Sequence, residues 1–238
     1  MSWSTVVVAP LASLLLAAQT LVCAQSPPPR PYGERLRLVP QNEAEFAPGF
    51  APVAARVAAA VRARDANAIL AIVSDDVQMV PGGDERGREA FRRHWNLDDR
   101  SSRFWTSVEE ILAGGSSFDG ECDNPEVTCY VTYPYWSERF PDRLDRLYYL
   151  VIHRADAPLY AQPRAGAAVV DRLSYDVVRR VFDSDVASSE TWTEVVRLDG
   201  RRGFVRTSDT YNPTFGVRMI VQRSASGAWE VVGVIAGD

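Results

Sequence analysis

Two adjacent carboxylates and one histidine are the side chains best suited to acid–base chemistry in this chain. Asp75 and Asp76 precede the short alternating segment Val77–Val80, and His94 belongs to a helical segment further on. A carboxylate held in a pocket can act as a general base. Such a pair more often joins a helix to a strand with both side chains in solvent. We therefore expect a protein that is not an enzyme. The alternative is a hydrolase or isomerase that uses Asp75, Asp76 and His94.

Other residue types that support catalysis or metal binding are sparse. The two histidines, His94 and His153, do not stand at a spacing that binds zinc. The sequence contains no Gly-x-Ser-x-Gly elbow of the kind that presents a catalytic serine, and no phosphate-binding loop. We therefore expect neither a metal site nor a cofactor.

The first 24 residues are typical of a signal peptide. The residues from Val6 to Val22 are almost all apolar, and this run is slightly shorter than the roughly 20 residues that a membrane-spanning helix needs. Val22-Cys23-Ala24 has the character of a cleavage site. We predict cleavage after Ala24, which gives a periplasmic or secreted protein that begins at Gln25 and has no stable membrane span. Because residues 1–5 contain no Arg or Lys, an uncleaved anchor is the alternative.

Cysteine use agrees with export. Once Cys23 has left with the signal peptide, only Cys122 and Cys129 remain, and the polar segment between them contains an Asn-Pro turn signal. An even pair around a short loop in an oxidising compartment predicts a disulfide. A metal site would need more ligands than this spacing offers.

Composition restricts the class of partner. The formal net charge is −5, and all 26 basic residues are arginines. A nucleic-acid-binding protein would favour a basic surface, so we exclude a nucleic-acid partner. The apolar content of 46% is ordinary for a globular protein.

The periodicity of apolar residues predicts an α+β protein in four parts after the signal peptide. These parts are a Pro-rich extended linker (25–42), a helix-rich α+β domain (43–146), a region of strands (147–211) and a terminal hairpin (212–238). The predicted helices are 52–64, 68–73, 88–95 and 102–113. The predicted strands are 77–80, 128–135, 147–153, 168–173, 176–182, 192–198, 203–206, 216–222 and 228–234. The terminal hairpin could return to pair with the first domain.

Three segments of the strand region carry a resemblance to a known family. They are Ala157-Pro158-Leu159-Tyr160-Ala161-Gln162-Pro163, Ala168-Val169-Val170-Asp171-Arg172-Leu173 and the run from Trp192 to Val205. The last contains a strand, the turn Asp199-Gly200 and a return strand that ends in Gly-aromatic-Val. Over about residues 148–211 the chain resembles the bacterial SH3-type (SH3b-like) domain of exported proteins, which implies a small β-barrel.

The SH3-type resemblance implies a ligand-binding role. It predicts an exported envelope protein that binds peptide, peptidoglycan or another envelope protein by aromatic stacking and charge-assisted hydrogen bonds. The predicted contact residues are Tyr160, Trp192, Arg201, Arg202, Phe204 and Tyr211. The chain departs from the family at Tyr160-Ala161-Gln162, where an arginine usually precedes a serine-proline turn, and its loop 183–191 is long. A structural protein without a ligand is the second alternative.

The first domain is similar, more weakly, to the nuclear-transport-factor-2-like folds. The residues that carry this similarity are Ala63-Arg64-Asp65, Ile69–Val73, Asp75-Asp76-Val77, Pro81-Gly82-Gly83 and Gly87-Arg88-Glu89-Ala90-Phe91. The similarity implies helices followed by a curved sheet, often with a ligand pocket.

An aromatic run separates the two parts. It contains Tyr130, Tyr133, Tyr135 and Trp136. We expect these residues to form the seam between the parts, and the alternative is an exposed face that grips a peptide or a sugar ring.

Overall fold

The computed structural model describes residues 34–80, 85–124, 128–183 and 190–237 of the 238-residue chain. The predicted signal peptide and the first part of the predicted linker lie outside these residues. The described residues belong to one compact unit. None of the helices within these ranges is long and apolar enough to cross a membrane.

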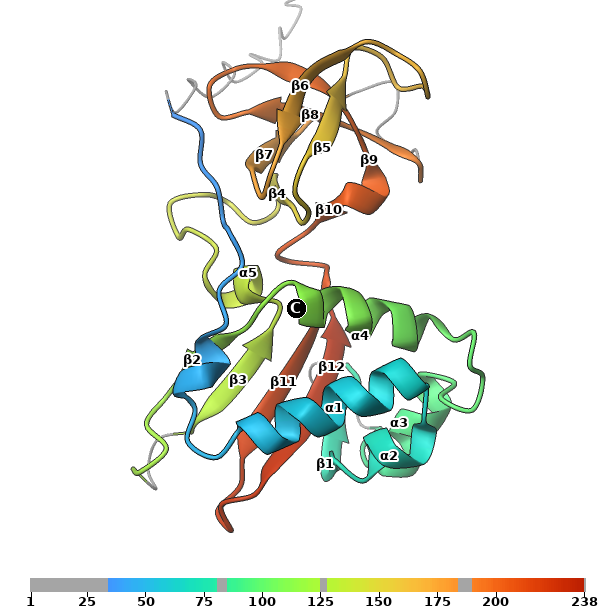
Figure 1. Cartoon of the computed structure of the whole chain (residues 1–238), viewed down its shortest axis with the longest axis vertical. Coiled ribbons are helices and arrows are strands. Elements are labelled where there is room, and N and C mark those ends of the chain that lie inside the picture. The colour runs from blue at the N-terminus through green and yellow to red at the C-terminus, as the bar shows by residue number, and fades with distance from the viewer. Residues whose placement is uncertain (1–33, 81–84, 125–127, 184–189, 238) are drawn as a thin grey trace, which may run out of the picture. The chain divides into compact units, whose positions relative to one another are not determined.

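The chain forms an α+β structure (Figure 1). The helices are η1 (Glu43–Phe46), α1 (Ala51–Ala63), α2 (Ala66–Leu70), α3 (Arg88–His94), α4 (Arg103–Ala113), α5 (Tyr135–Glu138) and η2 (Thr207–Asp209). The strands are β1 (Val73–Gln78), β2 (Ser117–Asp119), β3 (Tyr130–Tyr133), β4 (Tyr149–Ile152), β5 (Ala157–Tyr160), β6 (Val169–Leu173), β7 (Val177–Arg180), β8 (Trp192–Arg197), β9 (Arg202–Arg206), β10 (Thr210–Tyr211), β11 (Val217–Arg223) and β12 (Trp229–Ala236).

The predicted helix boundaries have local causes. The Asp65 carboxylate accepts a hydrogen bond of 3.0 Å from the Ala68 amide and so caps α2. The Ser102 hydroxyl caps α4 through the Phe104 amide at 3.2 Å. The helix ends at Ala113, as predicted, before two glycines.

The first sheet is mixed and has the strand order β1-β12-β11-β3-β2. The terminal hairpin β11–β12 occupies its centre: β12 pairs in parallel with β1, and β11 pairs antiparallel with β3. Helices α1 and α4 cover one face of this sheet (Figure 1). Large buried side chains, among them Phe91, Phe104 and Trp105, fill the space between helices and sheet.

Three sequence predictions in this domain were wrong in detail. The strand predicted at 77–80 is β1, which runs from Val73 to Gln78. Residues 68–73 were predicted as one helix, but α2 ends at Leu70 and β1 already begins at Val73. The apolar run there fits a buried helix and a buried strand equally well. Its second half becomes a strand because it pairs with β12, where the Val231 amide donates to the Ile72 carbonyl. The predicted strand 128–135 ends at Tyr133, and Trp136 belongs to the short helix α5.

The second sheet is antiparallel, with the strand order β10-β4-β7-β8-β9-β5-β6. Within the described residues its two edge strands, β10 and β6, do not pair, so the strand order is open rather than that of a closed barrel. One face buries an apolar core that includes Leu159, Val195 and Val205. Strand β5 was not predicted, because its sequence Ala-Pro-Leu-Tyr is short and contains proline.

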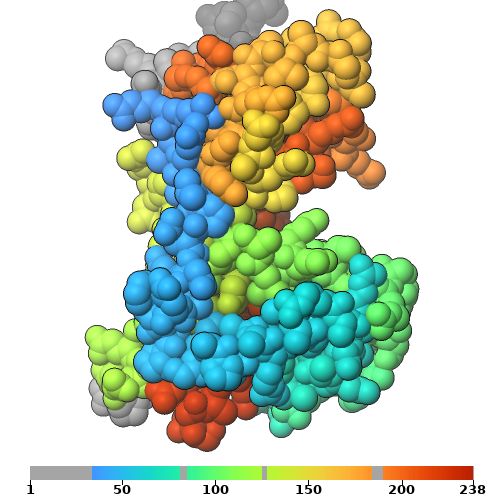
Figure 2. Space-filling model, in the orientation of Figure 1, coloured from blue at the N-terminus to red at the C-terminus, as the bar shows by residue number. Residues whose placement is uncertain are grey.

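The segment that precedes η1 is extended and attached to the second sheet. The Leu38 amide donates to the Tyr175 carbonyl at 2.8 Å, and the Val177 amide donates to the Leu36 carbonyl at 2.9 Å. Arg35 forms an ion pair with Asp176, whose side chain is fully buried. Figure 2 shows this blue segment running over the surface of the molecule. Residues 34–42, predicted as the end of a linker, therefore take part in the folded unit.

Candidate ligand-binding site

The residues of the alternative enzyme site are exposed and have separate partners. Asp75 forms an ion pair with Arg88 at 3.2 Å, and its side chain is 84% exposed. Asp76 lines an open groove on the uncovered side of the mixed sheet. His94 is exposed on α3, with its ring against Trp95. Among the described residues no hydrogen bond or ion pair links His94 to Asp75 or Asp76, so the structure does not assemble the three into one hydrogen-bonded site.

Four of the six predicted ligand-binding residues share one face of the second sheet. The register places Phe204 opposite both Tyr160 and Glu194, and Trp192 opposite Arg206. Directly opposite residues in antiparallel strands point to the same face, as do residues two apart along a strand. We call this surface the aromatic face. Its residues are Pro158, Tyr160, Trp192, Glu194, Arg202, Phe204 and Arg206.

A stack of three side chains lies at one end of the aromatic face. The rings of Tyr160 and Trp192 meet edge to face with centroids 5.3 Å apart. The guanidinium of Arg206 lies over the Trp192 ring, 4.1 Å from its centroid. Trp192 is only 8% exposed, whereas Tyr160 and Arg206 are half-buried. Trp192 is therefore the packed base of the stack, and the other two side chains keep their outer surfaces exposed.

The middle of the aromatic face combines a charge pair with Phe204. Arg202 donates a hydrogen bond to the buried Glu194 carboxylate, and this bond raises the pKa of the Arg202 guanidinium. The Arg202 side chain is nevertheless 61% exposed. Phe204 is half-buried between Glu194 and Tyr160 in the strand register. The face can thus offer aromatic carbon and guanidinium hydrogen-bond donors side by side.

An open groove of about 560 Å³ borders the stack. Its lining residues are Arg154, Pro158, Tyr160, Glu190, Thr191, Arg206, Ser208 and Asp209. Arg154 and Asp209 form an ion pair of 3.2 Å across it, with the Arg154 side chain 58% exposed and that of Asp209 nearly buried. The walls of the groove therefore carry charges of both signs and an aromatic edge. This combination could accommodate a peptide, which has polar backbone groups and mixed side chains.

The other two predicted ligand-binding residues lie elsewhere. Arg201 is at the β8–β9 turn, where its guanidinium donates to the Val170 carbonyl at 3.1 Å and lies 3.6 Å from Asp171. Tyr211 is buried at the junction of the two sheets. Its hydroxyl donates to the Val217 carbonyl at 3.2 Å and forms a 2.8 Å hydrogen bond with Ser137. Burial raises the pKa of Tyr211 to about 12.

Sequence reasoning missed three residues that build the site: Arg154, Arg206 and Asp209. Arg206 lies opposite Trp192 because three residues, 198–200, separate the paired Arg197 and Arg201, whereas counting from a two-residue Asp199-Gly200 turn places Thr207 there. Arg154 and Asp209 had no sequence signal, because they meet only when β10 pairs with β4.

The seam between the two parts contains Trp136, as expected. This side chain is 2% exposed and packs with Tyr149 and Tyr211. Tyr133 was expected at the seam but is buried in the core between the helices and the mixed sheet, and burial raises its pKa to about 12.

The predicted disulfide between Cys122 and Cys129 is present. The guanidinium of Arg223, in β11, donates a hydrogen bond of 2.9 Å to the carbonyl of the disulfide-bonded Cys122. Within the described ranges, no group of three or more His, Cys, Asp or Glu side chains is placed to hold a metal ion.

Comparison of the chain with protein-family models, curated proteins and solved structures finds no significant match in any of the three. The functional argument therefore depends on the geometry of the aromatic face and its groove.

Proposed function

We propose that this protein is an exported bacterial envelope protein that binds peptide segments, in cell-wall material or in a partner protein, through an SH3-like domain of residues 147–211. The observation that carries the proposal is the register of β8, β9 and β5. It aligns Tyr160, Phe204 and the arginines Arg202 and Arg206 on one face that the rest of the described chain leaves accessible. Export is supported by the Cys122–Cys129 disulfide, since such bonds persist outside the reducing cytoplasm.

Recognition would combine two kinds of contact. The half-buried rings of Tyr160 and Phe204 give flat apolar area with little side-chain entropy to lose, and proline or an apolar side chain of the ligand would pack on them. Arg202 and Arg154 keep more than half of their side-chain surface exposed while paired to buried carboxylates. Their remaining N–H groups can donate to carbonyl or carboxylate oxygens of the ligand.

A retention assay on purified peptidoglycan tests the cell-wall form of the proposal. The mature chain from Gln25 is compared with Tyr160→Ala and Arg206→Ala after each variant is shown to be folded by circular dichroism. Tyr148→Ala is the control, because Tyr148 is a tyrosine more exposed than Tyr160, at 49%, that packs on Phe182 and does not line the groove. Saturable retention that both groove variants weaken and the control preserves supports the proposal.

An array of immobilised peptides of about a dozen residues tests the protein-partner form with the same variants. Peptides that bind the wild type and lose binding in Tyr160→Ala and Arg206→Ala, but not in Tyr148→Ala, support it. Retention by neither peptidoglycan nor peptides, or retention that the two groove variants leave unchanged, overturns the assignment of binding to the aromatic face.

A further inference from the structure

A second, smaller cavity lies where the mixed sheet meets the antiparallel sheet, apart from the aromatic face. Its volume is about 90 Å³. On this measure one water molecule needs roughly 10–15 Å³, so the cavity has room for a group of several heavy atoms. Its walls come from α4, α5, β4, β10 and β11, and the lining residues are Ser107, Glu110, Ile111, Pro134, Trp136, His153, Thr210, Tyr211 and Val217.

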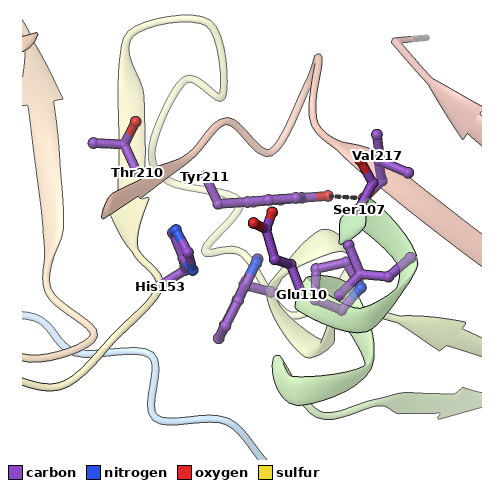
Figure 3. Close-up of a pocket in the computed structure, with 9 residues that line it drawn as sticks. Ser107, Glu110, His153, Thr210, Tyr211 and Val217 are labelled. Carbon is purple, nitrogen blue, oxygen red and sulfur yellow. Dashed lines mark hydrogen bonds between the residues drawn. The ribbon is translucent and has the colours of Figure 1, made fainter. Parts of the chain in front are cut away.

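The charge of this cavity is unusual for the chain. All 26 basic residues of the protein are arginines, yet no arginine lines the cavity. Glu110 is the only carboxylate among the lining residues. Figure 3 shows its side chain extending from α4 toward the ring of Tyr211, with His153 reaching in from the end of β4. The walls therefore favour a cation.

Two aromatic rings form the apolar part of the wall. The Trp136 and Tyr211 rings are tilted by 59° with centroids 5.9 Å apart. The Tyr211 hydroxyl already donates to the Val217 carbonyl, whereas the Trp136 Nε1 atom is buried and has no hydrogen-bond partner among the described residues. The faces of the two rings carry the negative side of the π quadrupole, which attracts a cation.

The histidine adds an acceptor. His153 Nε2 lies 2.7 Å from the Ser208 carbonyl oxygen, and a carbonyl oxygen can only accept, so Nε2 carries the proton. In the tautomer that carries its one proton on Nε2, Nδ1 is an acceptor. A carboxylate, an imidazole acceptor and two aromatic rings are the groups that recognise an alkylammonium ion.

We propose that this cavity binds a primary alkylammonium group. The chain contains no lysine, so none of its own side chains can supply this group, and the ligand is sought in another molecule. The ammonium N–H groups donate to Glu110, and the attached methylenes pack against Ile111 and Val217. The site is independent of the aromatic face, and either can be disproved while the other stands.

Titration with n-butylammonium chloride, followed by ¹H–¹⁵N correlation spectra of the mature chain, tests the proposal. We expect saturable shifts in the amides of residues 107–111 and in the Trp136 indole resonance. n-Butanol, which has the same length without the charge, should give no saturable shift at equal concentration. Glu110→Gln should weaken binding roughly tenfold, the loss of one charge-assisted hydrogen bond.

The matched control is Glu109→Gln, which removes an exposed carboxylate next in sequence that does not line the cavity. It should bind n-butylammonium as the wild type does. Equal shifts with n-butanol, equal weakening in Glu109→Gln, or saturable shifts confined to residues away from the cavity would each overturn the ammonium site.

Discussion

Arg206 covers the ring of Trp192 at 4.1 Å, and Tyr160 meets the same ring at its edge. These two contacts give the three residues different roles within the aromatic face. Trp192 is held by two neighbours and anchors the fold, so the ligand contacts are assigned to the neighbours. Substitutions that remove a neighbour should therefore change binding more than stability.

The first prediction compares two arginines of the same hairpin. Arg206→Ala removes one cation–π contact and one wall of the groove, so we expect a clear loss of ligand retention and a stability loss of about 1 kcal/mol or less. Arg201→Ala, at the turn, should leave retention unchanged because Arg201 does not line the groove. Retention on peptidoglycan and urea unfolding of both variants check this. A larger loss of retention in Arg201→Ala than in Arg206→Ala would instead place the ligand site at the β8–β9 turn.

The second prediction concerns the attachment of residues 34–42. Asp176 is fully buried and accepts hydrogen bonds from Arg35 and from the Ser174 amide. Arg35→Ala leaves this carboxylate buried without its cation, which should destabilise the fold by about 3–5 kcal/mol. Arg172→Ala breaks the exposed pair with Asp156 and should cost about 1 kcal/mol or less. Denaturant unfolding measures both, and similar values would show that the segment is not held by this pair.

Sequence patterns predicted most of the elements but little of what joins them. Helix α4 could be read from its apolar spacing, its Ser102 cap and the glycines that follow. The burial of Tyr211 could not, because it depends on Ser137, far away in sequence, and on the close approach of Gly216 to the Tyr211 ring. Arg35 was assigned to a linker for a similar reason. Local composition near Arg35 contains no information about a buried carboxylate at position 176.

The aromatic face shows the same limit at the level of the site. Trp192 and Phe204 were found because they lie in one hairpin with a strong turn signal. The groove beside them needs β5, β9 and η2 together, so its Arg154–Asp209 pair follows from tertiary pairing alone.

The third prediction is a loss of stability at alkaline pH. Burial raises the pKa of both Tyr133 and Tyr211 from 10.0 to about 12. Between these values the unfolded chain releases protons that the folded chain keeps, so stability falls as pH rises from about 10 to 12. Each tyrosine contributes up to about 2–3 kcal/mol. Tyr211→Phe should flatten this fall in urea unfolding series, and the chain has no lysine to titrate in the same range. An unchanged slope in Tyr211→Phe would show that Tyr211 ionises in the folded state.

The fourth prediction concerns acid. Arg139 bridges Glu43 and Asp119, at 2.6 Å and 2.9 Å, and so ties η1 to β2 and α5. Hydrogen bonding from the Arg139 guanidinium lowers the pKa of Glu43 below 4.5. The stabilisation is therefore complete above the unfolded value near 4.5 and is lost as pH falls through the lower folded value.

Glu43→Gln isolates this contribution. At pH 7 the variant should be less stable by about 1–3 kcal/mol, because the charge-assisted bonds to Arg139 become neutral ones. Below the folded pKa of Glu43 the difference between variant and wild type should shrink, since protonation removes the same charge from the wild type. Glu45→Gln, an exposed neighbour in η1, serves as the control and should follow the wild type throughout. Urea unfolding in a series of buffers from pH 7 down to the acid limit of folding measures the difference, and a gap that stays constant with pH would contradict the assigned role of the Glu43 charge.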